Sequence, residues 1–353
     1  MPINMGGDES TSIMPTHPFK PISGEIKTLT IESAALKGNL CGAPHTRSVD
    51  VYLPSGWQEM DNLPLLVDLV GFTGSGPAHL NWKPFAESLP QRLERLVDEG
   101  KMGPVALAFP DCFTSLGGNQ YINSEATGNW ATFLIDEMIP VIEKEFSVGG
   151  APELRGVFGK SSGGYGAIAH GMLYADTWGA IAVHSGDMGW DRLFMGDFPK
   201  AVTSIEKHGG YDGFLEHIAD GKKVKGEDFH TLMIIAMGAS YDPDSNNPKG
   251  VSLPVDLRTS VLDMDAWSRW LSHDPVVMVE REDVQYNLRK LKGIFLDCGS
   301  KDQYNIHFGT RQLSDRLNEL EIKHIHEEFD DTHSSIDYRM DVSLPFLYSA
   351  LMG

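Results

Sequence analysis

Short apolar runs rich in β-branched residues alternate with longer segments whose apolar side chains recur at helical spacing, and this alternation constrains the fold most strongly. Strands separated by helices pair in parallel, because each connection crosses back over the sheet. We therefore expect an α/β fold with a mostly parallel eight-stranded sheet and helices on both faces, the first two strands entering antiparallel. The expected strands cover residues 26–31, 48–53, 65–70, 104–109, 154–158, 180–184, 293–297 and 324–329.

Two amphipathic segments and one long insertion complete the expected organisation. Residues 82–99 and 129–146 carry Phe, Leu, Ile and Met at helical spacing, and Pro140 is expected to kink the second helix or to tighten its turn. Residues 187–291 separate two strands that a short crossover would normally join, which predicts an inserted helical cap. The expected parts are a flexible N-terminal segment at 1–20, a core at 21–186 and 292–353, and the cap at 187–291.

A glycine-rich turn, Gly159-Lys160-Ser161-Ser162-Gly163, follows an apolar strand and precedes a helix of small residues. G-x-S-x-G in this setting is typical of a nucleophile elbow, in which a sharp turn exposes the serine hydroxyl. Glycine suits both flanks, because a side chain there would clash across the turn. The alternative is an ordinary glycine-rich turn, and the strand–turn–helix setting favours Ser161 as a nucleophile.

A serine hydroxyl needs a base to remove its proton, so an acid and a histidine should follow the serine in that order. Asp302 comes just after the strand expected at 293–297, at the carboxyl end where such sheets assemble their sites. His333 lies in the loop after the last expected strand. Asp297 is a rival acid, but it falls inside the strand pattern, where a structural hydrogen bond is the simpler role. The expected triad is Ser161, Asp302 and His333.

Acyl transfer also needs N–H donors for the tetrahedral oxyanion. The amide after the nucleophile belongs to Ser162. The loop after the strand at 65–70 supplies a second donor, for which the Phe72 amide is the first choice and the Thr73 amide the alternative. A phosphate cradle is the rival interpretation of this loop, but the loop has neither the lysine of a Walker sequence nor a spaced G-x-G-x-x-G.

Other polar clusters suggest metal sites only weakly. His324 and His326 alternate along the last strand and could form a metal pair with Glu328, but alternate polar residues more often line one strand face. The run beginning at Asp242 starts like a calcium loop and lacks its glycine and its last glutamate. We expect no metal and no cofactor. Two further histidines are expected to be buried and hydrogen-bonded: His170 and His184.

The charge of the chain limits its partners. With 29 Lys and Arg against 49 Asp and Glu, the formal net charge is −20, which repels nucleic acid and anionic membranes and suits neutral or cationic substrates. Only three widely spaced cysteines occur, which argues against a disulfide framework. The N-terminal stretch is polar and does not read as a signal peptide, so we expect a cytoplasmic protein.

Segments along most of the chain resemble one branch of the α/β-hydrolases. They include RSVDVYLPSGW, VGFTGSG, AFPD, LIDEMIPVIEKEF, GKSSGGYGA, HSGDMGW, DCGSKDQY and EEFDDTHSSIDYR. The chain is similar to the putative-esterase branch, which contains S-formylglutathione hydrolase, feruloyl and enterochelin esterases and mycolyltransferases. The resemblance implies an α/β-hydrolase fold and an esterase without metal or cofactor, with Ser161, Asp302 and His333 as nucleophile, acid and base. Many members carry Met or Leu where this chain has Ser162.

Three functions are compatible with these residues: a carboxylesterase for short-chain or aromatic acyl esters, an acyltransferase that uses the same acyl-enzyme, and a non-catalytic binding protein. The complete triad favours the first, with a small-molecule ester as substrate. Trp267 and Trp270 of the cap are expected at a surface that would make the protein a homodimer, with a hydrophobic lid as the alternative. Residues expected to contact the substrate are Thr73, Trp82, Tyr121, Met188 and Trp190.

Overall fold

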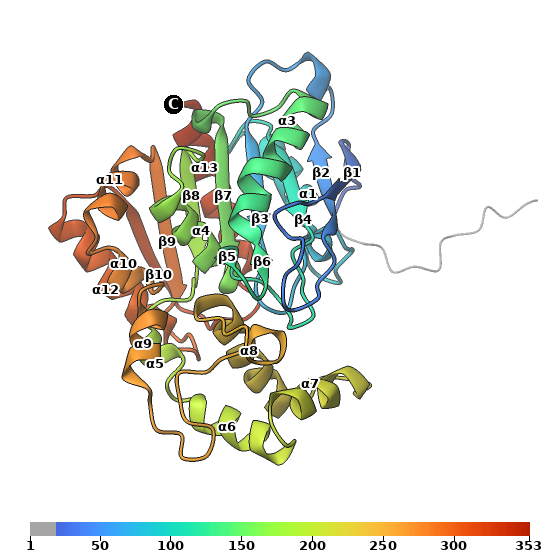
Figure 1. Cartoon of the computed structure of the whole chain (residues 1–353). Coiled ribbons are helices and arrows are strands. Elements are labelled where there is room, and N and C mark those ends of the chain that lie inside the picture. The colour runs from blue at the N-terminus through green and yellow to red at the C-terminus, as the bar shows by residue number, and fades with distance from the viewer. Residues whose placement is uncertain (1–18) are drawn as a thin grey trace, which may run out of the picture.

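The computed structural model describes residues 19–353, so the flexible segment expected at 1–20 lies almost wholly outside the described residues. An eight-stranded sheet runs through the molecule with helices on both faces (Figure 1). All eight expected strands are present, which confirms the α/β class. They are β1 (Glu25–Glu32), β2 (Thr46–Leu53), β3 (Leu65–Leu69), β4 (Ala106–Pro110), β7 (Arg155–Lys160), β8 (Ala180–His184), β9 (Gly293–Gly299) and β10 (Ile325–Phe329).

The strand order is β1-β2-β4-β3-β7-β8-β9-β10. β1 pairs with β2 and β2 with β4 in antiparallel fashion, which confirms the expected antiparallel entry. All later pairs are parallel. The carboxyl ends of β3, β7, β8, β9 and β10 therefore meet at one edge of the sheet, and the loops that follow these strands can share one site.

Apolar side chains fill both faces of the sheet. One face is covered by α1 (Leu89–Asp98) and α13 (Met340–Met352), whose leucines pack on the strands. The other face is covered by α3 (Ile139–Phe146), α4 (Ser162–Leu173) and α12 (Ile306–Glu319). Burial on both sides explains why Asp68 is the only polar residue in β3 and β4.

Two helix predictions need correction. The helix expected over 82–99 begins at Leu89, because Ser88 and Gln91 form a reciprocal capping box that sets its first turn. The helix expected over 129–146 is continuous, running through α2 (Trp130–Thr132) and a π-helical stretch (Phe133–Met138) into α3. Pro140 has no N–H to bond the preceding turn, and the turn before it is widened, not tightened.

The segment expected as a cap, 187–291, is largely helical. In Figure 1, α6, α8 and α9 lie beyond the strand ends, whereas α10 and α11 return to pack on α4. The helices are α5 (Trp190–Leu193), α6 (Phe198–Lys207), α7 (Tyr211–Asp220), α8 (Gly226–Tyr241), α9 (Met264–Leu271), α10 (Pro275–Met278) and α11 (Glu282–Lys290).

The interface expected at Trp267 and Trp270 is wrong. Their exposed fractions are 4% and 0%, so neither side chain is available to a partner. Both indoles contact Phe198 edge-on, with ring centroids 5.6 and 5.7 Å apart, and Trp270 also packs against Phe194 and Tyr241. The inserted helices are numerous enough to enclose an aromatic core of their own, which the apolar stripe of α9 completes.

Candidate active site

Ser161 lies at the turn between β7 and α4 in a strained conformation, with φ 57° and ψ −124°. Its amide donates to the carbonyl of His184 on the neighbouring strand over 3.0 Å. A Cβ on Gly163 would lie 1.8 Å from the carbonyl oxygen of Leu69, and one on Gly159 would lie 2.3 Å from the same atom. Only glycine fits at both positions, so the residues around Ser161 form the sharp elbow that the sequence predicts.

Asp302 and His333 come from the loops that follow β9 and β10. The Nδ1 atom of His333 lies 2.7 Å from Oδ2 of Asp302, and both residues are buried. The amide of Tyr304 donates to the other carboxylate oxygen over 2.8 Å, and the His333 amide donates to the side chain of Gln303 over 3.0 Å. These bonds fix the imidazole with its Nε2 edge free for another partner.

The electrostatics of this pair keep Asp302 ionised. Burial alone would raise the pKa of Asp302, but the hydrogen bond and charge of His333, with the Tyr304 amide, hold that pKa below its ordinary value. An ionised Asp302 accepts the Nδ1 proton of His333, which leaves the lone pair of Nε2 as a base.

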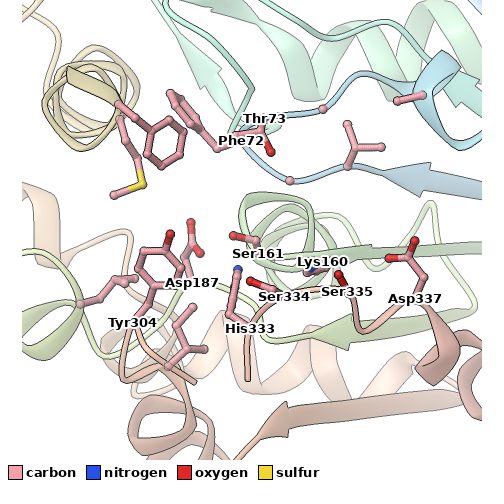
Figure 2. A pocket seen from close by; sticks show the side chains of 18 of the residues that line it. Phe72, Thr73, Lys160, Ser161, Asp187, Tyr304, His333, Ser334, Ser335 and Asp337 are labelled. Carbon is pink, nitrogen blue, oxygen red and sulfur yellow. The ribbon is translucent and has the colours of Figure 1, made fainter. Parts of the chain in front are cut away.

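Ser161 and His333 open into the same cavity, whose volume is about 310 Å³. Figure 2 shows the His333 ring pointing toward Ser161 from below, with Phe72 and Thr73 on the opposite wall. A volume of this size suits a small molecule. An apolar wall is formed by Phe72, Leu193, Phe194, Phe229, Met233 and Ile306.

The loop after β3 approaches the elbow closely. A Cβ on Gly71 would lie 3.3 Å from the Cβ of Ser161, so glycine lets the backbone of this loop reach the nucleophile. The Phe72 carbonyl accepts a 2.8 Å bond from the Gly118 amide, which holds the loop in place. Ser162 is the first residue of α4, where amides have no partner inside the helix. Both expected oxyanion donors, Phe72 and Ser162, thus lie next to Ser161, and their role stays a prediction.

A second Ser–His–Asp arrangement lies inside the protein. His184 joins Asp297 through Nδ1 over 2.7 Å and Ser343 through Nε2 over 2.8 Å, and Arg339 donates to the other oxygen of Asp297 over 2.8 Å. All three members are buried, and none of them lines the cavity. Asp297 therefore belongs to a buried network, whereas Asp302 bonds His333, which lines the cavity.

The expected substrate contacts divide into one that lines the cavity and four that do not. Thr73 lines it. Met188 and Trp190 are wholly buried, and Tyr121 is buried with its hydroxyl donating to the Val70 carbonyl over 2.6 Å. Trp82 is 56% exposed and lies outside the cavity. These four expectations need correction: three side chains turn into the core, which takes up large apolar groups, and Trp82 precedes a helix that begins seven residues later than expected.

Several cavity residues were missed from the sequence. Lys160 and Asp187 line the cavity on two sides of Ser161, and Tyr304 lies beside Asp187 (Figure 2). Asp187 follows the end of β8 by three residues, at the edge where the other site residues gather. That position could have indicated it, because polar residues after parallel strands share the carboxyl edge.

The remaining polar clusters serve local structure. His324 bonds Ser314 and the Ile322 carbonyl, and Glu328 pairs with Arg311. His170 is buried between the Tyr121 carbonyl and Trp178, and burial lowers its pKa to about 4.

Over residues 19–353, no group of three His, Cys, Asp or Glu is placed to hold a metal ion. Within the same range, no helix has both the length and the apolar character needed to cross a membrane.

The fold is that of the α/β-hydrolases. The family model described as "Putative esterase" matches residues 43–341, so the chain belongs to this esterase family. No curated protein matches the sequence significantly.

Solved structures with the same fold share little sequence with this chain. A ferulic acid esterase is 18% identical, with a TM-score of 0.61, over 93% of this chain and 99% of its own. A ferulic acid esterase from Anaeromyces mucronatus is 16% identical, with a TM-score of 0.54, over 93% and 89%. An S-formylglutathione hydrolase from Staphylococcus aureus is 11% identical, with a TM-score of 0.55, over 94% and 99%. At these identities the likeness concerns the fold.

Proposed function

We propose that the protein is a carboxylesterase that hydrolyses short-chain or aromatic acyl esters through Ser161, His333 and Asp302. The observation that carries the proposal is the 2.7 Å bond between His333 and Asp302 beside an elbow serine in the same cavity. In this arrangement His333 takes the Ser161 proton as the hydroxyl attacks the ester carbonyl, and then protonates the leaving alcohol. The Phe72 and Ser162 amides stabilise the oxyanion, and water releases the acyl group by the reverse steps.

The shape of the cavity supports an aromatic or short apolar group on the substrate. Phe72 and Phe229 meet edge-on with ring centroids 5.6 Å apart, and Phe194 belongs to the same wall. Flat rings favour such edge and offset contacts. Similar structures include esterases of ferulic acid, an aromatic acid, which agrees with this choice.

The helices of 187–291 are proposed to act as the cap that selects the substrate. Phe229 and Met233 of α8 and Leu193 of α5 line the same cavity as Ser161 and His333. Loops and insertions at the carboxyl edge commonly define the specificity of open α/β sheets. The division into a core at 21–186 and 292–353 and a cap at 187–291 belongs to this proposal.

The test of the proposed function is covalent labelling of the serine. A fluorophosphonate should add to the wild-type protein once, on the peptide that contains Ser161, and Ser161→Ala should lose both the label and p-nitrophenyl ester hydrolysis, by at least about 10³-fold. Ser335→Ala is the matched control, because Ser335 lines the same cavity and should leave the labelling intact. Full hydrolysis by Ser161→Ala would disprove the assignment.

A further inference from the structure

Asp187 is a buried carboxylate that the hydrolytic steps do not use. It lies beside the nucleophile, because its amide approaches the Ser161 carbonyl at 3.4 Å. A Cβ on Gly164 would lie 2.7 Å from the Cα atom of Gly186, so the chain leading to Asp187 rests directly on the start of α4. The side chain lines the cavity, and Figure 2 shows it next to Ser161 and Tyr304.

A chain of buried hydrogen bonds holds this carboxylate in place. The Tyr241 hydroxyl donates to Gln120 over 2.8 Å, and the Gln120 amide donates to the Ser162 hydroxyl over 2.8 Å. The Ser162 hydroxyl donates in turn to Oδ2 of Asp187 over 3.2 Å. A carboxylate has acceptor sites for about four hydrogen bonds, so this anchor leaves further capacity for a ligand in the cavity.

In the described part of the chain, Asp187 forms no ion pair, and the only histidine whose charge lowers its pKa is His333. Within residues 19–353, the buried carboxylates of Asp68, Asp297 and Asp302 each pair with a histidine or an arginine, whereas Asp187 has no ion pair. Lys160 lies on the other side of Ser161 in Figure 2. Burial raises the pKa of Asp187 to about 6 against the opposing effects of His333 and the two serine hydroxyls. A buried carboxylate that has hydrogen-bond partners but no ion pair, next to a nucleophile, indicates a ligand-binding role.

The cavity around Asp187 defines the chemistry of that ligand. Phe72, Phe194 and Phe229 line the same cavity as Asp187, and aromatic faces attract an organic cation. An ammonium group next to the ester bond would supply the missing positive charge while its carbon chain contacts the rings. The net charge of −20 would favour the approach of such a molecule over long distances.

We propose that Asp187 is a specificity-determining residue that selects esters carrying an ammonium group close to the scissile bond. The proposal rests on the proposed esterase function and names its substrate class. The positive group could belong to the acyl part or to the alcohol part of the ester. In both cases Asp187 provides the counter-charge, and Ser161 attacks the carbonyl as in any other ester.

The test compares esters of equal size and different charge. On the acyl side, 3-aminopropanoyl, 3-hydroxypropanoyl and butanoyl p-nitrophenyl esters differ only in the terminal group. On the alcohol side, acetylcholine is compared with its neutral isostere 3,3-dimethylbutyl acetate. We expect the wild-type kcat/KM to favour the cationic member of at least one series by tenfold or more, and Asp187→Asn to reduce that ratio at least about tenfold.

Asp337→Asn is the matched control. Asp337 lines the same cavity on the far side of Ser161, and its carboxylate is already paired with Lys83 at 2.9 Å. Its replacement removes one negative charge from the cavity. The ratio of kcat/KM between cationic and neutral esters should stay within about twofold of wild type, because a carboxylate that is already paired with a lysine contributes little field. An equal effect of both variants would mean that the general potential, not Asp187, selects the substrate.

A measurement on the wild-type protein covers the case in which Asp187→Asn does not fold. The preference for the cationic ester should be full above pH 6 and decline as the pH falls through about 6, where Asp187 gains a proton. Both esters of a pair use the same hydrolytic groups, so a loss of turnover that is common to both esters cancels in the ratio. The nearby phenols of Tyr165, Tyr241 and Tyr304 stay neutral, because burial raises their pKa values.

The outcomes separate this proposal from the esterase function. Labelling of Ser161 with hydrolysis of butanoyl esters, but no cationic preference in either series, would overturn the role of Asp187 and leave the esterase intact. If the 3-hydroxypropanoyl ester were preferred over the butanoyl ester as strongly as the 3-aminopropanoyl ester is, the requirement for charge would be overturned. Absence of both labelling and hydrolysis would remove the esterase function and this proposal with it.

Discussion

At the scale of single residues, access to the cavity decides which of two Asp–His pairs can act on a substrate. In the Asp302–His333 pair the histidine lines the cavity, whereas Asp297 and His184 are enclosed with Ser343 and Arg339. Their hydrogen-bond lengths are the same, 2.7 Å in each case. Geometry within a pair therefore does not distinguish the proposed catalytic acid from the structural one.

The two acids should respond differently to the same substitution. Asp302→Asn should lower kcat by up to about 10⁴-fold, because the histidine tautomer is no longer held. Asp297→Asn should keep kcat per folded molecule near wild type and lower the free energy of unfolding by about 3 kcal/mol, because it breaks a buried ion pair. Kinetics with active-site titration and urea unfolding measure the two quantities. The reverse pattern would show that the acid was misassigned.

A second residue-scale prediction concerns the stability effect of Asp187. Its pKa in the folded protein, about 6, lies above the ordinary 3.8, so the folded state binds the proton more tightly than the unfolded state. The protonated carboxyl thus favours folding at low pH, and this contribution is lost as the pH rises through 6. Asparagine cannot ionise. From pH 5 to pH 8, Asp187→Asn should gain stability relative to wild type by on the order of 1 kcal/mol.

Urea unfolding of both proteins at the two pH values measures that difference. If the difference in unfolding free energy between the wild type and Asp187→Asn were the same at pH 5 and pH 8, the carboxylate would not be destabilised by burial. A gain in stability accompanied by a loss of cationic preference would fit a site that sacrifices stability for function.

At the scale of elements, the elbow depends on how closely β3, β7 and α4 approach one another. Gly163→Ala would bring a methyl group within 1.8 Å of the Leu69 carbonyl, a backbone atom that cannot move without disturbing β3. We expect a loss of several kcal/mol in stability, roughly the upper range for overpacking, together with loss of esterase activity. Thermal unfolding and p-nitrophenyl ester assays measure both.

Gly226→Ala is the matched control for the elbow. Gly226 begins α8, and a Cβ there meets nothing within 4 Å. Alanine in a helix should be neutral or stabilising by up to about 1 kcal/mol. Similar losses in the two variants would contradict the steric argument for Gly163.

At the scale of the whole molecule, the inserted helices form a second packed region beyond the strand ends. Trp270 is fully enclosed there by Phe198, Phe194 and Tyr241. Trp270→Ala should lower the free energy of unfolding by about 3–5 kcal/mol, because it leaves a large cavity. The mass of the native protein in solution should stay unchanged, because the indole is not at the surface. Light scattering and urea unfolding check these outcomes, and conversion to a smaller species would restore an interface role.

Much of the architecture follows from local sequence patterns. Each expected strand is present within a few residues, because apolar β-branched runs that are bounded by turns have few alternatives in a sheet covered on both faces. Ser161, Asp302 and His333 each follow an expected strand in the sequence, and these strands end at the same edge of the sheet. Helix boundaries were less accurate at Leu89, where the capping box, and not the apolar periodicity, fixes the first turn.

The sequence by itself determined the alternating sheet and helices, the glycine-dependent elbow at Ser161 and the strand ends on which Asp302 and His333 lie. These depend on periodicity and turn chemistry over a few residues. Only the tertiary structure decided that Trp190 and Trp270 belong to a core, that Asp297 is enclosed, and that Asp187 lines the cavity. The physical reason is that burial and charge pairing depend on residues brought together from distant parts of the chain.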